Sequence, residues 1–439
     1  MFCNKCGFEV EEGANFCPMC GAKFHLNEQA DMKKQDRKKQ KTKKTGNPKQ
    51  KILIALACVC ALIPIVMMIS GVAFRMGMKH YSDGVYYKYD KVTDSAHMYS
   101  VSKRKSRVVL SPKIRVGFTK YPVTAIGKGG YYSCTENLTS IEIPDSVTSI
   151  GEYAFSRYTN LASIEIPDSV TSIGEWAFSE CTNLTSITIP DSVTSIGIGT
   201  FSGCTNLTSI TIPDSVTSIG KHAFSGCTKL TIITIPDGVT SIGEWAFSHC
   251  SGLTSVTIPE SVTSIGECAF YYCKSLTDIT IPDAVSSIED SLFTQCESLT
   301  DITIPDGVTS IGERAFSNCS GLTSVTIPES VTSIGKCAFS YCSSLTSVTI
   351  PESVTSIGED AFFNCSSLTS VTMPDGVIPS KDYAFGMCSL HLKITGYEGY
   401  ESTEGTEDGE RYSRYSPDDF VDENAYREYS DFGDTSGLK

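Results

Sequence analysis

Histidine is scarce in this chain, with six residues among 439. Four of them are isolated and two occupy different positions of a repeated segment: His25, His80, His97 and His391, and His222 and His249. No Ser/His/Asp or Cys/His arrangement, pair of catalytic carboxylates or phosphate-binding glycine loop stands out in the sequence. We therefore predict that the protein is not an enzyme.

An excess of positive charge is also missing, since the formal net charge is -14. A protein whose main partner is nucleic acid needs a basic face for the phosphates, so we expect no nucleic-acid partner. The charge is nevertheless polarised along the chain. Residues 33–51 hold ten Lys/Arg and one acid, whereas residues 396–439 hold thirteen acids and four bases. Each block therefore needs its own interpretation.

The N-terminal segment carries two C-x-x-C pairs, Cys3 with Cys6 and Cys17 with Cys20, each followed by glycine. Two such pairs supply four thiolates in a tetrahedron, which is the geometry of a closed structural zinc site. A redox role for C-x-x-C needs a thioredoxin-like βαβ context, which is absent here. We predict a structural zinc site in residues 1–26. This segment resembles the short zinc-ribbon domains found at the N-termini of many bacterial membrane proteins.

A basic segment and an apolar segment follow. Residues 27–51 are Lys/Gln-rich and are predicted to be a disordered linker; a nucleic-acid-binding tail is the alternative. Residues 52–74 contain no charge, and as a helix of about 35 Å they are long enough to cross a bilayer. Pro64 predicts a kink. A cleaved signal peptide is the competing interpretation, but the apolar run is too long and a long leader precedes it.

The distribution of basic residues predicts the orientation of this span. Ten Lys/Arg precede it, and only Arg75 and Lys79 closely follow it. The positive-inside rule then places the N-terminus in the cytoplasm and the rest of the chain outside. The basic linker, residues 33–51, can lie against anionic lipid headgroups. We expect a single-pass protein of a bacterial-type plasma membrane.

A 23-residue period covers most of the remaining chain. Proline marks it at Pro144, Pro167, Pro190, Pro213, Pro236, Pro259, Pro282, Pro305, Pro328, Pro351 and Pro374. One unit reads L-T-S-I-x-I-P-D-S-V-T-S-I-G-x-x-A-F-S-x-C-x-x. In the unit around Pro167 the side chains expected to point inward are Leu161, Ile164, Ile166, Val170, Ile173, Ala177 and Phe178. A single unit cannot bury them alone, so the units must stack.

The repeated motif LTSIxIPDSVTSIGxxAFSxC resembles the leucine-rich repeat, specifically the BspA-type subfamily of bacterial surface proteins. The predicted fold is therefore a mainly β solenoid of about 11 coils over residues 123–395. Residues 84–122 resemble the β-rich segment that usually precedes such repeats, and we expect residues 75–122 to form a β-rich cap at the open end of the solenoid. Residues 396–439 are expected to be a disordered acidic tail.

Two ladders of side chains need an interpretation. Ten cysteines recur in register, at Cys181, Cys204, Cys227, Cys250, Cys273, Cys296, Cys319, Cys342, Cys365 and Cys388. We interpret them as small buried residues with inert thiols, with disulfides between neighbouring coils as the alternative. The Asp or Glu after each repeat proline is interpreted as a turn cap, with stacked calcium sites as the alternative.

Specificity is expected at the variable positions of the repeat, where Tyr153, Trp176, His222, Trp245 and Arg314 are candidates for a binding surface. The resemblance implies adhesion, since BspA-type proteins are associated with binding to host or neighbouring-cell components. The first hypothesis is thus a membrane-anchored surface protein that presents the solenoid to an extracellular protein or glycan. The alternative is a transmembrane sensor or assembly factor that couples the solenoid to a cytoplasmic partner of the zinc ribbon.

Overall fold

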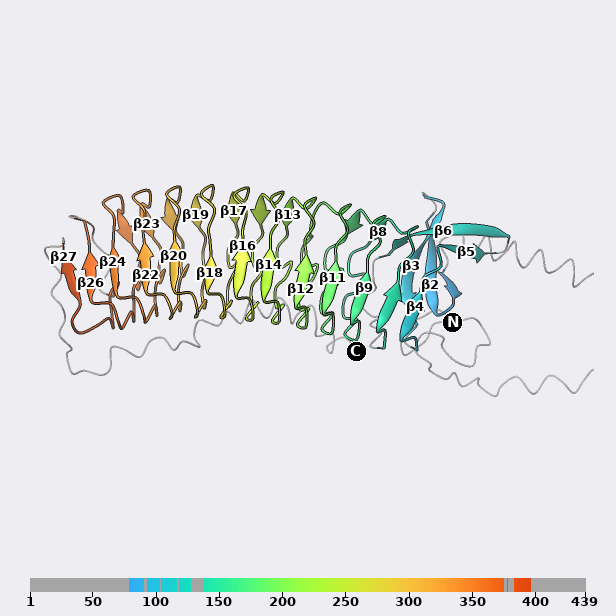
Figure 1. Cartoon of the computed structure of the whole chain (residues 1–439), viewed down its shortest axis with the longest axis horizontal. Coiled ribbons are helices and arrows are strands. Elements are labelled where there is room, and N and C mark those ends of the chain that lie inside the picture. Colours follow the sequence, from blue (N-terminus) through green and yellow to red (C-terminus); the bar gives the residue numbers. More distant parts are fainter. Residues whose placement is uncertain are drawn as a thin grey trace, which may run out of the picture. The chain divides into compact units, whose positions relative to one another are not determined.

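The computed structural model of the protein describes residues 79–90, 93–102, 104–116, 118–127, 137–374, 377 and 383–395. These residues form a β-solenoid of about 12 turns (Figure 1). No helix in these ranges could cross a membrane. The predicted zinc ribbon (1–26), linker (27–51), span (52–74) and acidic tail (396–439) lie outside the described residues.

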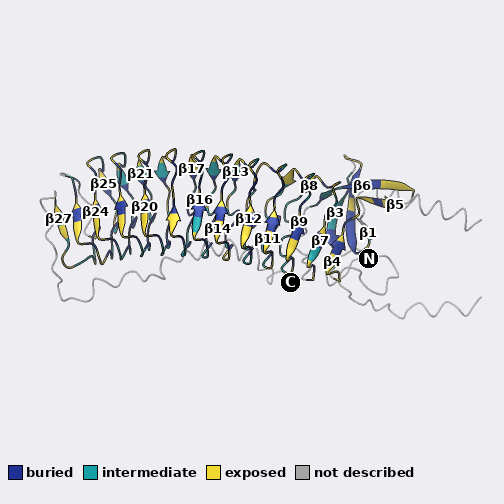
Figure 2. Ribbon diagram, viewed as in Figure 1, coloured by how far each residue is buried: buried dark blue, intermediate teal, exposed yellow. Residues whose placement is uncertain are grey.

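One side of the solenoid is a ladder of short parallel strands, one for each coil. Most neighbouring strands pair in register, so that Ile187 lies opposite Ile164 and Ile210. The strands are β7 (Ser140–Glu142), β9 (Ser163–Glu165), β11 (Ser186–Thr188), β12 (Ser209–Thr211), β14 (Ile232–Thr234), β16 (Ser255–Thr257), β18 (Asp278–Ile279), β20 (Asp301–Thr303), β22 (Ser324–Thr326), β24 (Ser347–Thr349), β26 (Ser370–Thr372) and β27 (Lys393–Thr395). In β11 the central residue is buried and its two polar neighbours are exposed, as expected for a strand whose successive side chains point to opposite faces. Figure 2 colours the strands by this burial.

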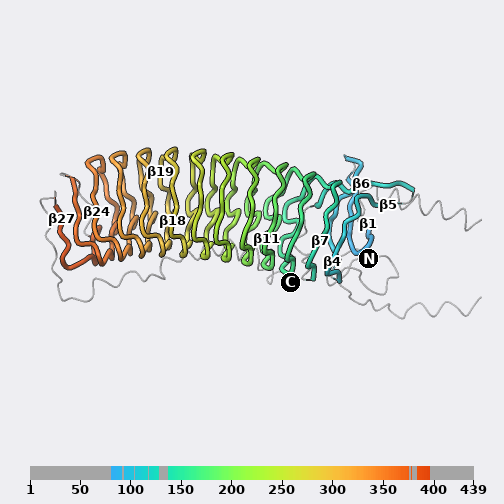
Figure 3. Tube along the Cα trace, in the orientation of Figure 1, coloured from blue at the N-terminus to red at the C-terminus, as the bar shows by residue number. Residues whose placement is uncertain are grey.

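A second ladder runs along another side and is built from the T-S-I-G segment of most units; at Ile196 it is reduced to an isolated bridge with Ile219. Its strands are β8 (Ser149–Ile150), β10 (Ser172–Ile173), β13 (Ser218–Ile219), β15 (Ser241–Ile242), β17 (Ser264–Ile265), β19 (Ser287–Ile288), β21 (Ser310–Ile311), β23 (Ser333–Ile334) and β25 (Ser356–Ile357). The glycine after the isoleucine is needed because the coils approach closely there. A Cβ on Gly174 would lie 2.5 Å from the backbone nitrogen of Glu152. The tube trace in Figure 3 shows the coils following one another along the solenoid.

The strands before the first repeat begin both ladders. They are β1 (Lys79–Ser82), β2 (Val85–Asp90), β3 (Ser95–Val101), β4 (Arg107–Val109), β5 (Lys113–Val116) and β6 (Thr119–Ile126). β6 pairs with β3 on one side and with β8 on the other, and β4 pairs with β7. These pairings occupy the backbone groups that the first coil would otherwise expose at an open edge. We expected about eleven coils, and the structure has about 12 turns because the cap strands and β27 extend the ladder.

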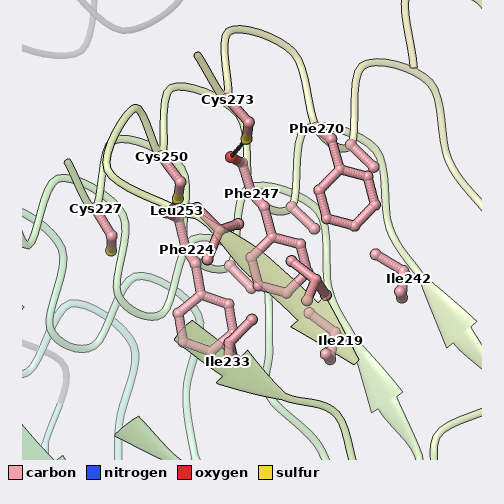
Figure 4. Packing of buried hydrophobic residues seen from close by; sticks show 14 of the residues in the cluster. Ile219, Phe224, Cys227, Ile233, Ile242, Phe247, Cys250, Leu253, Phe270 and Cys273 are labelled. Carbon is pink, nitrogen blue, oxygen red and sulfur yellow. Dashed lines mark hydrogen bonds between the residues drawn. The ribbon is translucent and has the colours of Figure 1, made fainter. Parts of the chain in front are cut away.

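The core is a column of aromatic rings. Phenylalanine recurs at every coil, and consecutive rings from Phe155 to Phe385 stack with centroids 5.1–5.7 Å apart. Figure 4 shows three of them, Phe224, Phe247 and Phe270. In the unit around Pro167, the residues predicted to point inward are buried, except Ile173, which is half-buried. Stacking therefore buries what one coil could not bury alone.

The cysteine ladder lies beside this column. Each thiol donates a hydrogen bond of 3.1–3.3 Å to the carbonyl oxygen of the Phe 26 residues earlier, as from Cys273 to Phe247 (Figure 4). The described cysteines are free thiols, and all but Cys388 are buried. Burial raises the pKa of Cys204 and Cys250 to about 12, which supports the interpretation of inert thiols.

In most coils a serine two residues after the proline holds the turn that follows it. Ser215 donates a hydrogen bond of 2.7 Å to the carbonyl oxygen of Val193, and Ser261 does the same to Val239. The carboxylates of the Asp/Glu ladder are exposed, as at Asp214. Where a serine follows the acid, it ties this turn to the preceding coil, and at Glu260 the carboxylate itself accepts a hydrogen bond of 3.3 Å from the backbone N–H of Asp283 in the next coil.

Candidate binding surface

The G-x-x-A-F-S-x-C segment forms the remaining side of each coil, which we call the outer turn. Alternate N–H groups of this turn bond to the next coil: Trp176 N to Ile198 O at 2.8 Å and Glu180 N to Ser202 O at 2.7 Å. Both donors have left-handed backbones, with φ of 56° for Trp176 and 57° for Glu180. Such a backbone costs a non-glycine residue about 1–2 kcal/mol. These hydrogen bonds between coils help to hold it in place.

All five residues predicted for a binding surface occupy the first left-handed position of the outer turn. They are Tyr153, Trp176, His222, Trp245 and Arg314, with φ between 52° and 57°. Each of them is half-buried. A single repeat position therefore presents these side chains along one line of the solenoid.

The structure brings the first four of these residues together, and Tyr271 joins them. Ring centroids are 6.4 Å apart for Tyr153–Trp176, 6.2 Å for Trp176–His222, 6.0 Å for His222–Trp245 and 5.5 Å for Trp245–Tyr271. The first three pairs are within 33° of parallel, and the last is tilted by 55°. We call these five rings the aromatic row.

Arg314 does not belong to the aromatic row. The residues at its repeat position in the two preceding coils are Cys268 and Ser291, so no ring connects it to Trp245. Its guanidinium instead forms an ion pair of 2.9 Å with Glu313. Arg314 was predicted together with the four aromatic residues because it occupies the same repeat position. In the structure it is separated from their rings because Cys268 and Ser291 lie between it and Trp245.

Trp176 and His222 contact each other although a whole coil lies between them. The residue at the same position of that coil is Gly199. A Cβ on Gly199 would lie 2.1 Å from Cε3 of Trp176 and 2.4 Å from both Cδ2 and Cζ3. The indole of Trp176 therefore occupies the space that a side chain at position 199 would fill. The missing side chain thus lets Trp176 cover this coil and reach His222.

The row continues into residues that the repeat pattern does not single out. His249 lies 5.3 Å from Tyr271 and 5.1 Å from Tyr272 between ring centroids, and the ammonium of Lys274 lies 4.4 Å above the ring of Tyr272. A signal was present in the sequence, because Tyr271 replaces the serine of the A-F-S motif. The repeat pattern could not show that Tyr271 leans back toward Trp245.

The row itself is uncharged near neutral pH. Burial lowers the pKa of His222 to about 4, aided by Lys221, and burial also lowers the pKa of His249. The position preceding the row in each coil holds mostly acids: Glu152, Glu175, Ile198, Lys221, Glu244, Glu267 and Asp290. Burial, followed by the charges of Asp290 and Glu244, raises the pKa of Glu267. Lys221 pairs with Glu244 at 2.7 Å. An aromatic strip with an acidic edge results.

The predicted zinc ligands Cys3, Cys6, Cys17 and Cys20 lie outside the described residues. Within the described ranges, no three His, Cys, Asp or Glu side chains are grouped so that they could hold a metal ion.

Comparisons with known proteins agree with the repeat pattern. The family described as BspA type leucine rich repeat region matches residues 124–251, 194–323 and 286–402, together more than half of the chain, and a zinc-ribbon domain family matches residues 2–24. A leucine rich cell surface protein from Faecalibacterium prausnitzii is 31% identical, with 74% of this chain and 96% of that chain covered and a TM-score of 0.49. A leucine-rich repeat protein from Bacteroides ovatus is 28% identical, with coverages of 72% and 94% and a TM-score of 0.52. No curated protein matches the sequence. The chain belongs to the BspA type leucine rich repeat family.

Proposed function

We propose that the protein is a cell-surface binding protein that recognises an extracellular protein or glycan through the aromatic row. The observation that carries this proposal is the row itself. The residues that stacking requires recur in every coil, but the rings at the outer turn do not. Later coils place Cys268, Ser291, Cys337 and Asp360 at the same position. Half-buried aromatic side chains that the fold does not require are typical of binding hot spots.

The solenoid supports a binding role in a second way. Its coils are tied by two strand ladders and by the hydrogen bonds of the outer turn, so the rings are held on a rigid support. A surface that is ordered before binding loses little conformational entropy when a partner docks. This arrangement suits recognition of a partner.

A binding experiment with the full chain in detergent micelles tests the proposal. The protein is applied to an array of immobilised glycans and extracellular-matrix proteins. The variant Trp176→Ala/Trp245→Ala should bind the selected partner at least about 30-fold more weakly, since a hot-spot residue contributes about 2 kcal/mol or more. Ile232→Ala is the matched control, because Ile232 is 61% exposed but lies on β14, in the first strand ladder and not on the outer turn. Equal binding by the double variant and wild type would refute the role of the row.

The remaining parts of the chain complete this proposal. Residues 52–74 form a single membrane span with the N-terminus in the cytoplasm, and residues 33–51 contact anionic lipid on that side. Cys3, Cys6, Cys17 and Cys20 hold a structural zinc ion, in agreement with the family match at residues 2–24. Protease treatment of intact cells tests the orientation, since a protected solenoid would contradict it.

The zinc ribbon favours a second candidate function, in which the solenoid's occupancy is sensed by a cytoplasmic partner. The match at residues 2–24 is the observation behind it. Affinity capture with the full chain, before and after zinc removal, tests this candidate. If no partner depends on zinc, the ribbon is only a folding unit and the sensor function fails.

A further inference from the structure

The hairpin of β5 and β6 in the cap has two different faces. Ile114, Val116 and Tyr121 are buried, and Tyr121 packs 5.3 Å from Tyr89 between ring centroids. The other face is exposed and basic, with Lys113, Arg115 and Lys120. Figure 1 shows the hairpin projecting beyond the neighbouring strands of the cap.

The basic face is not explained by folding. Arg115 and Lys120 are direct partners across the two strands, and like charges in this position destabilise a hairpin. Within the described residues, neither of them nor Lys113 forms an ion pair with an acid. An arrangement that weakens the hairpin points to an anionic partner outside it.

The end of the hairpin is apolar. Phe118 lies in the turn between the two strands and is 78% exposed. A free phosphate group would interact with the basic residues but not with the exposed phenyl ring of Phe118. A bilayer surface would interact with both, because aromatic side chains favour the headgroup region and basic residues are attracted to anionic lipids.

The position of the hairpin along the chain agrees with such a partner. The proposed span ends at residue 74 and β1 begins at Lys79, so the four residues between them reach at most about 14 Å. β1, β2, β3 and β6 are consecutive neighbours in one sheet, so only two strands separate β1 from the β6 strand of the hairpin. Residues 75–122 also contain eleven Lys/Arg and three acids, although the whole chain is acidic.

We propose that the β5–β6 hairpin docks on an anionic phospholipid surface, with Phe118 among the headgroups and Lys113, Arg115 and Lys120 on the lipid phosphates. This inference rests on the proposed function for the membrane span that brings the hairpin close to the bilayer. The contact gives the solenoid a second attachment point and orients it relative to the membrane.

The experiment places a tryptophan at the end of the hairpin. The full chain, with Trp176→Phe and Trp245→Phe to remove the native tryptophans, carries Phe118→Trp. It is reconstituted into vesicles of brominated phosphatidylcholine with or without phosphatidylglycerol. We expect strong quenching of Trp emission in the anionic vesicles and weak quenching in the neutral ones. Ile232→Trp in the same background is the matched control and should stay unquenched in both, since β14 lies several coils away.

A second variant tests the cations. Arg115→Gln/Lys120→Gln removes the cross-strand repulsion, so the hairpin should fold at least as well as wild type. Each cation near an anionic surface changes its affinity about fivefold, so this variant should dock about 30-fold more weakly and lose most of the quenching. Equal quenching in anionic and neutral vesicles, or an undiminished signal from the Gln variant, would overturn the proposal.

The span and the hairpin can fail separately. A chain that carbonate extracts from the vesicles lacks a membrane span, which would contradict the proposed anchor. The same chain is then floated with preformed anionic vesicles. Quenching of the tryptophan at position 118 in that arm supports the hairpin without the span, and its absence overturns the hairpin proposal as well.

Discussion

The indole of Trp176 packs against Gly199, in the coil that follows it, and fills the space of the missing side chain. A Cβ at residue 199 would come within 2.1 Å of the ring, and the left-handed φ of 59° makes glycine favourable there for a second reason. The contact lets Trp176 reach His222, with 6.2 Å between ring centroids. The aromatic row is therefore continuous across a coil that contributes no ring to it.

Gly199→Ala should displace this indole. The methyl group would occupy ring space, which costs about 1–3 kcal/mol, in addition to about 1–2 kcal/mol for the left-handed backbone. We expect a changed Trp emission spectrum and a lower urea midpoint. Gly226→Ala is the matched control: its φ is 74°, but its Cβ would meet no atom closer than 3.6 Å. If both variants behave alike, the contact does not hold the indole.

Phe247→Ala should be among the most destabilising substitutions in the solenoid. Its ring is fully buried between Phe224 and Phe270, with centroids 5.3 and 5.4 Å away. A cavity of this kind costs about 3–5 kcal/mol. Urea unfolding followed by circular dichroism measures the loss. Ile232→Ala is the control, because this side chain is exposed and its loss should change stability by no more than about 0.5 kcal/mol. A comparable loss of stability in both variants would contradict the assignment of the phenylalanine column as the core.

The solenoid should lose stability at alkaline pH. Burial raises the pKa of Cys204, Cys250 and Cys319 to about 12, whereas an unfolded thiol has a pKa of about 8.5. The folded state therefore retains protons that the unfolded state releases. The stabilisation is complete below about pH 8.5 and is lost as pH rises toward 12, with about 1.4 kcal/mol per pH unit for each thiol.

Unfolding midpoints between pH 8 and 10.5 measure this loss. Cys250→Ala should make the slope shallower by the share of one thiol. Cys388→Ala is the control, because the neighbouring side chain of Cys365 lowers the pKa of Cys388. An unchanged slope in Cys250→Ala would show that the buried thiols do not cause the loss of stability at alkaline pH.

His222 should make the solenoid sensitive to acid. Burial lowers its pKa to about 4, against about 6.5 in an unfolded chain. The unfolded state therefore binds the proton more readily, so the contribution is present above pH 6.5 and is lost as pH falls toward 4. His222→Phe keeps a ring beside Trp245 and removes the titration. Its unfolding midpoint should depend less on pH in this window, and a dependence equal to wild type would refute the assignment.

The binding of zinc by this chain should depend on the N-terminal cysteines alone. The purified full chain should contain about one zinc ion, and Cys17→Ser should lose it. Metal analysis of both proteins is the measurement. Chelation should leave the unfolding midpoint of the solenoid unchanged, because no metal-binding cluster lies within the described ranges. A midpoint that falls on chelation would place a metal in the repeats.

Much of the fold could be predicted because each coil repeats one local pattern. The alternation around Pro167 assigns Ile164 to the inside and Glu165 to the outside, and both lie there. The buried cysteines followed from the same period. The grouping of side chains at the outer turn was predicted less completely. Repeat position suggested Arg314, which the structure separates from the row, and it gave no reason to select Tyr271.

The sequence by itself determined the solenoid, its core column and the residues that every coil must bury. The reason is that each unit can bury its apolar side chains only by stacking against its neighbours in the same way. Only the tertiary structure decided which outward side chains meet. Trp176 reaches His222 because Gly199 has no side chain, and Arg115 faces Lys120 because the hairpin register places them opposite each other. Contacts of this kind depend on side-chain direction and on neighbours in other coils or strands, which a one-dimensional period does not contain.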